Sequence, residues 1–245
     1  MNLLPEVSII IPAYNEADRL PAHLQSVLNY FKELNMSHEI IIVDDGSSDN
    51  IARIVETFES DFVKVVRHPN NVGKGQAIKT GMSCSKGDLR LFTDADGSTP
   101  ITEFSKLLHA MKNGADVAVG SRSFTSSECV INALLHRKII GKIFRSLVYL
   151  LAVKNIKDTQ CGFKLFSKQT ANYVFPRQKI SGFGFDVEIL HLCNLSGFKI
   201  MEVPVNWSHV PGSKINLLKD SCIMFFEIIK IRYYQILGAY NLQRY

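Results

Sequence analysis

Residues 89–100 read LRLFTDADGSTP, a short apolar run that ends abruptly in two aspartates. The run is typical of a buried strand. In a continuing strand Asp94 and Asp96 would point to opposite faces, but Gly97 and the residues after it supply a turn that lets the carboxylates converge. Converging carboxylates suit a hard cation such as Mg²⁺ or Mn²⁺, which in turn binds phosphate oxygens. The other interpretation is that the aspartates only cap the strand end and begin the next helix.

Apolar segments with strand-like and helical spacing alternate on both sides of this stretch. Strands are expected at Val7–Ile11, Glu39–Val43, Phe62–Val66, Asp88–Phe92 and Asp116–Gly120, and helices at Ala17–Leu34, Ile51–Phe58, Gly73–Ser85 and Ile101–Met111. This rhythm predicts an α/β fold, a doubly wound and mostly parallel sheet with helices on both faces. Sheets of this kind bind ligands at the carboxyl ends of their strands.

Polar residues follow three of these expected strands. The first is followed by the run Pro12 to Glu16, the second by Asp44 and Asp45, and the fourth by Asp94 to Asp96. Tyr14 could stack on a base and Asp45 could accept a base N–H. Each set taken alone also fits an ordinary turn or helix cap. Together they predict a binding site at one edge of the sheet.

The same region lacks two familiar glycine-rich motifs that bind phosphate. The first strand lacks the G-x-G-x-x-G of a dinucleotide site, and Asn71–Gln76 lacks P-loop spacing. That second segment is expected to be a loop and helix start, where Lys74 either meets a phosphate or is simply exposed.

The composition indicates one large α/β domain with a C-terminal appendage. The chain has 245 residues, 46% hydrophobic and 21% charged, and its net charge of +5 does not demand nucleic acid as a partner. Its 5 cysteines lack a C-x-x-C pair, which favours reduced thiols over zinc or disulfides. The start of the chain lacks the basic region of a signal peptide, and uninterrupted apolar stretches are too short to predict a spanning helix.

Several segments of the first half resemble the family 2 inverting glycosyltransferases. They are VSIIIPAYNE (7–16), EIIIVDDGSSDN (39–50), HPNNVGKGQAIKTG (68–81), LFTDADGSTP (91–100) and ADVAVGSR (115–122). The resemblance implies the Rossmann-like nucleotide-diphospho-sugar transferase fold known as GT-A. It also implies roles for particular positions: nucleotide-sugar binding for Pro12, Tyr14, Glu16, Asp45, Lys74, Asp94 and Ala95, metal binding for Asp94 and Asp96, and contact with phosphate or acceptor for Arg122.

Segments of the second half are similar to the glycosyltransferases that use polyprenyl phosphates. They are DTQCGFKLF (158–166), FGFDVEIL (183–190), EVPVNW (202–207) and VPGSK (210–214). Within that group, DADGSTP and DTQCGFKLF resemble the dolichyl-phosphate β-glucosyltransferase branch. The mannosyl enzymes more often carry Leu-Gln where Gly97 and Ser98 stand. The resemblance therefore implies UDP-glucose as the sugar donor, with GDP-mannose next, and a polyprenyl or dolichyl phosphate as the acceptor.

The expected chemistry is metal-assisted transfer of a hexose. A divalent cation, Mg²⁺ or Mn²⁺, would neutralise the leaving diphosphate. The acceptor phosphate is already ionised at neutral pH, so a strong base is less necessary. By motif match, Asp158 is the candidate base or acceptor-positioning residue and Asp186 is the second, although Asp158 also fits a cap. Arg122, Ser213 and Lys214 would bind the acceptor phosphate.

Two helical patterns suggest contact with a membrane surface. Residues 131–154 combine apolar positions at helical spacing with several cations, which is typical either of an interfacial helix or of a surface helix packed on the sheet. Residues 217–237 form a second candidate, or else an oligomer contact. We therefore expect a catalytic domain over 1–212, a C-terminal amphipathic segment over 213–245, and peripheral attachment to the cytoplasmic face of a membrane.

Three other functions remain open from the sequence. DADGST resembles the phosphate-transfer motif of haloacid dehalogenase-type phosphohydrolases, but that motif normally follows the first strand of its fold. A transferase of the same fold could use a polysaccharide acceptor. A catalytically inactive binding module is a third possibility, and the presence of Asp94, Asp96, Arg122 and Lys214 weighs against it.

Overall fold

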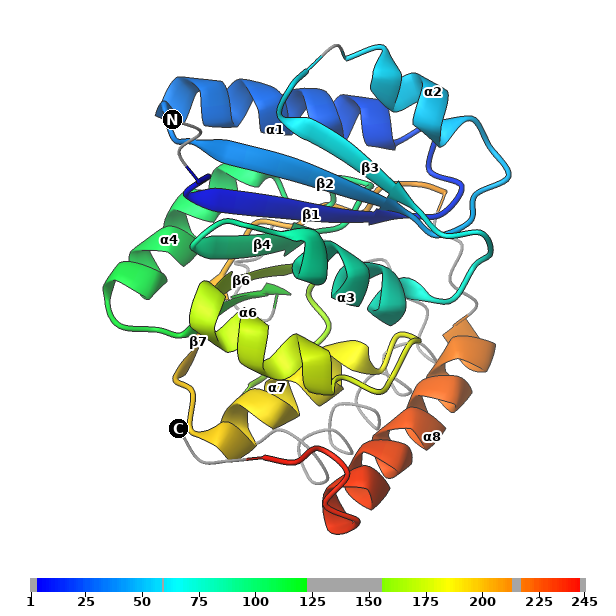
Figure 1. The fold of residues 1–245 in the computed structure, drawn as a ribbon, viewed down its shortest axis with the longest axis vertical. Helices are drawn as coiled ribbons and strands as arrows, with labels where there is room; N and C mark the ends of the chain where they lie inside the picture. The colour runs from blue at the N-terminus through cyan, green and yellow to red at the C-terminus, as the bar shows by residue number, and fades with distance from the viewer. Residues whose placement is uncertain (1–3, 59, 123–155, 213–216, 243–245) are drawn as a thin grey trace.

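The first strand of the chain lies near the middle of a seven-stranded sheet (Figure 1). The structure is a computed structural model that describes residues 4–58, 60–122, 156–212 and 217–242. The strands are β1 (Val7–Ala13), β2 (His38–Asp44), β3 (Val63–Arg67), β4 (Leu89–Thr93), β5 (Val117–Ser121), β6 (Phe163–Ser167) and β7 (Ile200–Pro204). The helices are α1 (Leu20–Leu34), α2 (Ile51–Glu56), α3 (Lys74–Cys84), α4 (Phe104–Lys112), α6 (Lys168–Val174), α7 (Phe185–Ser196) and α8 (Leu217–Ile236), with short 3₁₀ turns η1 (Ile101–Glu103) and η3 (Phe175–Arg177).

The sheet is mostly parallel, as the alternation of strands and helices predicted. Its order is β3-β2-β1-β4-β6-β5-β7. Strands β1 to β4 pair in parallel, and so do β5 and β7. Strand β6 runs antiparallel to both of its neighbours, β4 and β5. The sequence did not predict this reversal, which inserts a strand from the second half of the chain beside the aspartate-bearing strand.

Helices cover both faces of the sheet and bury two apolar clusters (Figure 1). The alternating residues of β1 divide between them: Ile9 and Ile11 face α1, α2 and α4, whereas Ile10 faces the side of α3, α6, α7 and α8. All three isoleucines are fully buried, with 0% exposure. A strand covered on both faces needs an uninterrupted apolar run, which explains the β-branched sequence of β1.

The carboxyl ends of the central strands meet at one edge. The Asp45 N–H donates to the carbonyl oxygen of Ala13 at 2.8 Å, and the His68 N–H donates to that of Asp44, also at 2.8 Å. The loops that follow β1, β2 and β3 are thereby held together, next to the end of β4.

Some of the expected features lie outside the described residues. The basic segment 131–154 falls within the undescribed range 123–155, and Ser213 and Lys214 fall within 213–216. Among the described residues, the helices are all too short or too polar to cross a membrane.

Candidate active site

A cleft of about 560 Å³ opens at the carboxyl ends of β1, β2 and β4. It brings together all of the predicted nucleotide and metal positions, which are Pro12, Tyr14, Glu16, Asp45, Lys74, Asp94, Ala95 and Asp96. Its other lining residues are Ala13, Arg19, Asn71, Gly73, Ala77, Gly182, Phe183 and Asp220. Segments from most of the chain's length thus converge on the edge that the strand ends predicted.

The turn after β4 shapes the two aspartates. Gly97 has a φ of +66°, a backbone conformation that glycine adopts without strain, and the Ser98 N–H donates to Asp96 Oδ1 at 3.0 Å. One oxygen of each aspartate faces a cation. Asp94 Oδ1 lies 2.6 Å from Lys74 Nζ, and Asp96 Oδ2 lies 3.5 Å from Arg19 Nη1. The turn therefore leaves both carboxylates lining the cleft, each of them paired with a cation.

These carboxylates fit a divalent cation whose remaining coordination positions are filled by a substrate and water. Their side chains are 35% and 23% exposed, for Asp94 and Asp96, so oxygen ligands remain accessible from the cleft. Among the described residues, His, Cys, Asp and Glu do not gather in threes around a possible metal position. Mg²⁺ is commonly held by one or two carboxylates together with substrate phosphates and water. The carboxylates of Asp94 and Asp96 would supply the protein's part of such a site.

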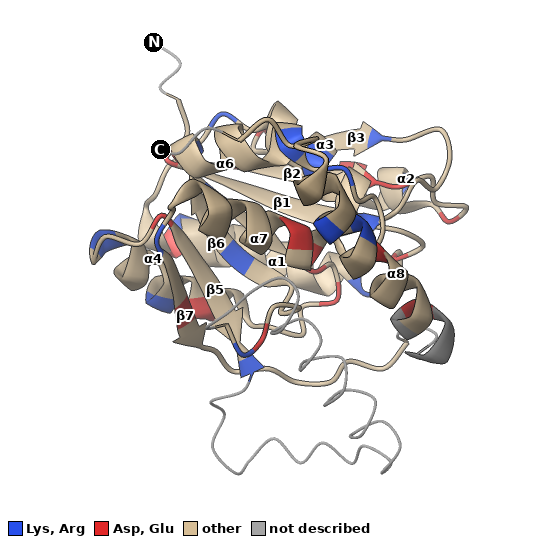
Figure 2. Cartoon of the chain, turned by 90° about the horizontal axis from the view of Figure 1, so that it is seen from below, with Lys and Arg blue, Asp and Glu red and all other residues tan. Residues whose placement is uncertain are grey.

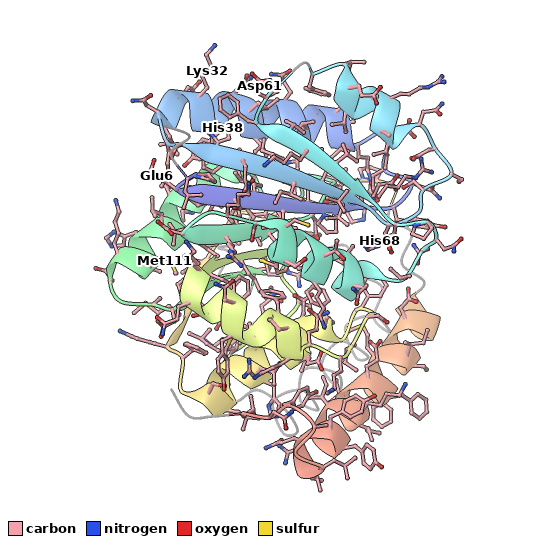
Figure 3. The ribbon with its side chains drawn as sticks, viewed as in Figure 1. Glu6, Lys32, His38, Asp61, His68 and Met111 are labelled. Atoms are coloured by element: carbon pink, nitrogen blue, oxygen red, sulfur yellow. The ribbon has the colours of Figure 1, made fainter. Side chains whose placement is uncertain are left out.

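Asp45 organises the loop beneath the cleft. Its Oδ1 accepts from the Val72 N–H at 3.1 Å and lies 2.7 Å from His68 Nδ1, and its Oδ2 accepts from the Gly73 N–H at 2.8 Å. The other ring nitrogen of His68 lies 3.0 Å from Thr80 Oγ1 on α3. His68 stands at the strand ends in Figure 3. The sequence prediction included Asp45 but missed His68, which lies two positions after the end of an expected strand.

Arg19 is a second residue that the prediction missed. Its Nε donates to Glu16 Oε2 at 2.6 Å, so Glu16 lines the cleft as part of an ion pair with this arginine. The pair stands at spacing i, i+3 before α1, which is a local signal that sequence reading could have used. Burial opposes the charge on Arg19, but Glu16 and the two aspartates outweigh it, so the pKa of Arg19 is raised. The cleft thus keeps a permanent cation beside Asp96.

Arg122 and Asp158, residues from two distant motifs, form one ion pair. Arg122 Nε and Nη2 donate to the two Asp158 oxygens at 2.7 and 2.8 Å, and the Arg122 N–H donates at 3.0 Å. The Asp158 N–H is in turn bound by Glu202 at 2.9 Å. Burial opposes both charges, yet the paired hydrogen bonds dominate, so the pKa of Asp158 is lowered and that of Arg122 is raised. This geometry favours a positioning role for Asp158 over the role of a base.

Asp186 lies beneath the cleft rather than in its lining. It is 5% exposed and forms an ion pair with Lys164, which is itself 1% exposed. Figure 2 shows α7 next to β6, the two elements that carry these residues. Burial raises the pKa of Asp186, and the charges of Lys164 and Lys74 only partly offset it. Asp186 therefore supports the charge of Lys74 from beneath the cleft.

Glycines allow the second half of the chain to approach the aspartates. A Cβ on Gly162 would lie 1.9 Å from Asp94 Oδ2, so only glycine leaves room for that carboxylate. The Asp94 N–H also donates to the Gly162 carbonyl at 3.2 Å. Gly182 lines the cleft together with Phe183.

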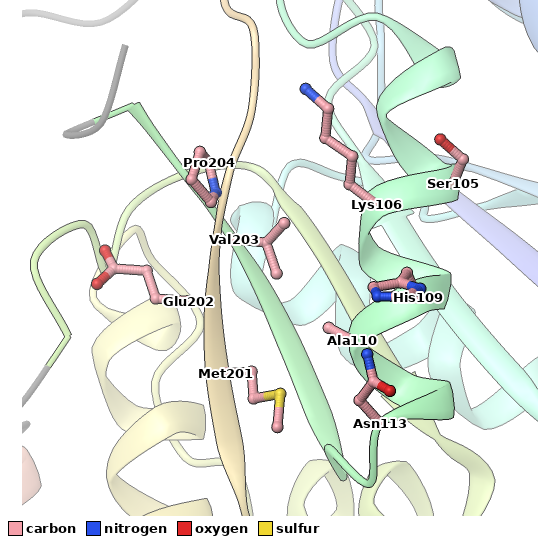
Figure 4. A pocket seen from close by; sticks show the side chains of 9 residues that line it. All are labelled: Ser105, Lys106, His109, Ala110, Asn113, Met201, Glu202, Val203 and Pro204. Carbon is pink, nitrogen blue, oxygen red and sulfur yellow. The ribbon is translucent and has the colours of Figure 1, made fainter.

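A second hollow, of about 730 Å³, lies between α4 and β7 (Figure 4). Its described lining residues are Ser105, Lys106, His109, Ala110, Asn113, Met201, Glu202, Val203 and Pro204. None of these was predicted as a site residue. The smaller cleft, in contrast, is lined by the predicted site residues together with other charged and aromatic side chains. It is therefore the candidate active site.

Comparison with known proteins gives a consistent result. The family model described as "Glycosyl transferase family 2" matches residues 8–175. A dolichyl-phosphate beta-glucosyltransferase of Dictyostelium discoideum is 39% identical over 251 residues, covering 97% of this chain and 77% of the relative. The Homo sapiens protein of the same name is 33% identical, covering 98% of this chain and 78% of its own length.

Solved structures share the fold. Glucosyl-3-phosphoglycerate synthase from Mycobacterium tuberculosis, in complex with Mn²⁺, UDP-glucose and phosphoglyceric acid, has a TM-score of 0.67. The similarity covers 98% of this chain and 81% of that one at 16% sequence identity, so it concerns the fold alone. The phosphohydrolase alternative is not supported, because the D-x-D motif follows β4 rather than the first strand and the family matched is a different one.

Proposed function

From the premise that the chain belongs to glycosyl transferase family 2 and is a glycosyltransferase, we propose that it moves glucose from UDP-glucose to a polyprenyl or dolichyl phosphate. The observation that carries this proposal is the convergence of the predicted nucleotide and metal positions on one cleft. Relatives that are 33–39% identical over nearly the whole chain bear the name of this reaction and support the choice of sugar and acceptor.

In this proposal the donor lies across the strand ends. Tyr14 would contact the base and Asp45 would hold the base through its carboxylate or through the loop that it organises. Asp94 and Asp96 would hold Mg²⁺ or Mn²⁺, which supplies charge neutralisation for the diphosphate. Lys74 and Arg19 would donate charge-assisted hydrogen bonds to the same phosphates. UDP then leaves with the electron pair of the broken bond to the sugar.

The acceptor would enter from the side of Arg122. One oxygen of its ionised phosphate forms the new bond to the anomeric carbon on the face opposite the leaving UDP, so the configuration inverts and no proton must be removed. Asp158 would hold the Arg122 guanidinium towards that phosphate. Ser213 and Lys214 are proposed as further phosphate contacts on the basis of their motif. Positioning and electrostatics would then supply most of the rate.

The test uses purified protein with Mg²⁺ or Mn²⁺, a short-chain polyprenyl phosphate, and UDP-glucose or GDP-mannose in parallel. We expect nucleotide release together with glycolipid formation with UDP-glucose. Asp96→Asn should lower the rate at least about 100-fold, as removal of a group that stabilises transition-state charge does. Asp61→Asn, an exposed aspartate in the loop before β3, is the matched control.

The outcomes of this assay separate the alternatives. Turnover with GDP-mannose alone would overturn the donor assignment. Release of nucleotide without glycolipid would indicate another acceptor, such as a polysaccharide. Nucleotide binding that is indifferent to both the metal and Asp96 would contradict the proposed metal site.

We also propose that α8 attaches the protein to a lipid surface. The outer face of α8 comprises Ile223, Phe225, Phe226, Ile229, Tyr233 and Ile236, all of them exposed. Phe226 is 61% and Ile236 is 80% exposed. Figure 3 shows side chains of this helix extending away from the body of the molecule. Lys230 and Arg232 are the exposed charges on the described part of the helix, and cations beside an apolar face suit anionic lipid.

The attachment would be peripheral and on the cytoplasmic face, where thiols such as the free and exposed Cys84 and Cys222 stay reduced. Flotation with anionic vesicles tests it, with the double variant Phe226→Ser/Tyr233→Ser expected to remain unbound. A stable dimer in size-exclusion chromatography, dissolved by the same double variant, would instead assign this face to a homo-oligomer.

A further inference from the structure

Glu227, on the inner side of α8, reaches into the loop that lines the cleft. Its Oε2 accepts from the Gly184 N–H at 2.7 Å, and its carboxylate also binds the Gly182 N–H. A Cβ on Gly182 would lie 2.3 Å from Glu227 Oε1, and one on Gly184 would lie 2.7 Å from Oε2. The carboxylate therefore fills space that exists only because both positions are glycine.

The other side of the same loop packs on the start of α3. The Gln76 N–H donates to the Ser181 carbonyl at 3.2 Å, and a Cβ on Gly73 would lie 2.5 Å from that same oxygen. Gly73 lines the cleft and is held by Asp45, and the next residue, Lys74, reaches Asp94. Loop 181–184 is thus clamped between Glu227 and the segment that presents the phosphate-facing lysine.

Helix α8 combines this clamp with two different faces. Met224, Ile228 and Ile231 are buried on its inner side, and Ile228 and Ile231 have 0% exposure. The outer face is apolar and exposed, as described above. At its first turn, Asp220 lines the cleft. One helix therefore touches the sheet's core, the loop at the cleft and the surface proposed to meet lipid.

Resting on the proposed function, we propose that Glu227 is a positioning residue that couples α8 to the nucleotide cleft, so that docking on lipid and nucleotide binding strengthen each other. Docking would order α8, and through Glu227 it would order loop 181–184 and the start of α3. Coupling of this kind is reciprocal, since a ligand that favours the ordered state at one site favours it at the other. The packed loop between the two sites is the physical connection that such coupling requires.

The experiment measures the affinity for UDP with Mn²⁺ by calorimetry, with and without anionic vesicles that lack any acceptor. In the wild type we expect vesicles to tighten UDP binding about five-fold, the lower end of typical coupling. Glu227→Gln should still float with vesicles but lose this effect, because the neutral amide offers one acceptor oxygen in place of two and places an NH2 donor against the loop N–H groups. Glu33→Gln, an exposed glutamate on α1, is the matched control and should retain it.

Hydrogen exchange of the Gly182 and Gly184 amides supplies a readout that does not depend on the ligand. Vesicles should slow this exchange in the wild type and in Glu33→Gln, but not in Glu227→Gln. Equal tightening of UDP binding by vesicles in the wild type and in Glu227→Gln would overturn the proposal. An affinity of the wild type for UDP that does not change when vesicles are added would overturn it as well. Failure of the wild type to bind UDP at all would instead refute the proposed function on which the coupling rests.

Discussion

His23 is a buried histidine directly under the turn that carries the aspartates. Its Nε2 lies 3.3 Å from Thr93 Oγ1, and its ring fills the space beside Gly97. Burial lowers its pKa to about 4, although the charges of Asp96 and Asp94 oppose the shift. The ring is therefore neutral in the folded protein at neutral pH, and it acts as a packing group at the base of the site.

This shift predicts a pH-dependent stability. Between about pH 6.5 and 4 the unfolded chain binds a proton at His23 that the folded chain does not, so the free energy of unfolding falls as the pH falls through this window. The full difference is at most about 3.4 kcal/mol, from 1.36 kcal/mol for each of the 2.5 pKa units between 6.5 and about 4. Urea unfolding at pH 7, 5.5 and 4.5 measures it. His23→Gln should flatten the slope, and an unchanged slope would contradict the assignment.

Gly162 offers a second test at the scale of one residue. Gly162→Ala places a methyl group where the Asp94 carboxylate now lies, so Asp94 must rotate away from Lys74. We expect the affinity for UDP with Mn²⁺ to fall at least about ten-fold, the equivalent of about 1.4 kcal/mol. Gly238→Asn is the control, since a Cβ there meets nothing within 4 Å and asparagine tolerates the φ of +64° at that position. Unchanged nucleotide affinity in Gly162→Ala would show that Asp94 is not part of the nucleotide–metal site.

At the scale of elements, the first half of the fold followed from local pattern and the second half did not. The β-branched run of β1 and the helical spacing of α1 are signals within one segment. The reversed direction of β6 depends on pairing with β4 and β5, which no local pattern records. Helix α7 is buried on nearly every side, from Phe185 to Ser196, so it lacks the one-sided apolar stripe that marks an amphipathic helix.

The candidate site divides along the same line. The cleft residues that follow β1, β2 and β4 were predictable, because parallel strands bring their carboxyl ends to one edge. The partner of Asp158 was not, since Arg122 stands 36 residues away and their bidentate pair exists only in three dimensions. The proposed role of Glu227 could not be predicted for the same reason. It depends on Gly184 and Gly182, which stand 43 and 45 positions earlier in the sequence.

The inner and outer faces of α8 should respond differently when a side chain is shortened to alanine. Ile228→Ala removes a fully buried side chain and should lower the free energy of unfolding by about 2–4 kcal/mol through lost burial and a cavity. Ile229→Ala, at the neighbouring position that is 44% exposed, should change it by less than about 0.5 kcal/mol. Urea denaturation of both variants measures the contrast. Equal losses would mean that the outer face is covered in solution.

At the scale of the whole molecule, charge is concentrated where the two halves of the chain meet. Asp94 and Lys74 come from the first half, whereas Lys164 and Asp186 come from the second. The first pair lines the cleft and the second pair lies beneath it. The strand β6, inserted beside β4, is what brings the second pair under the first. The active site is therefore a property of the complete sheet rather than of either half.

Under the proposed lipid attachment, the exposed face of α8 would confine the enzyme's encounters with a lipid-linked acceptor to the plane of the bilayer. A protein held on a bilayer meets lipid-linked phosphates by diffusion within a plane, while UDP-glucose still arrives from the bulk solution. The rate should then follow the mole fraction of acceptor in the surface rather than its concentration in the sample. Adding inert lipid at a constant amount of acceptor should slow glucose transfer in vesicles by about the dilution factor. The Phe226→Ser/Tyr233→Ser variant should be indifferent to that dilution, because its encounters with the acceptor would take place in three dimensions.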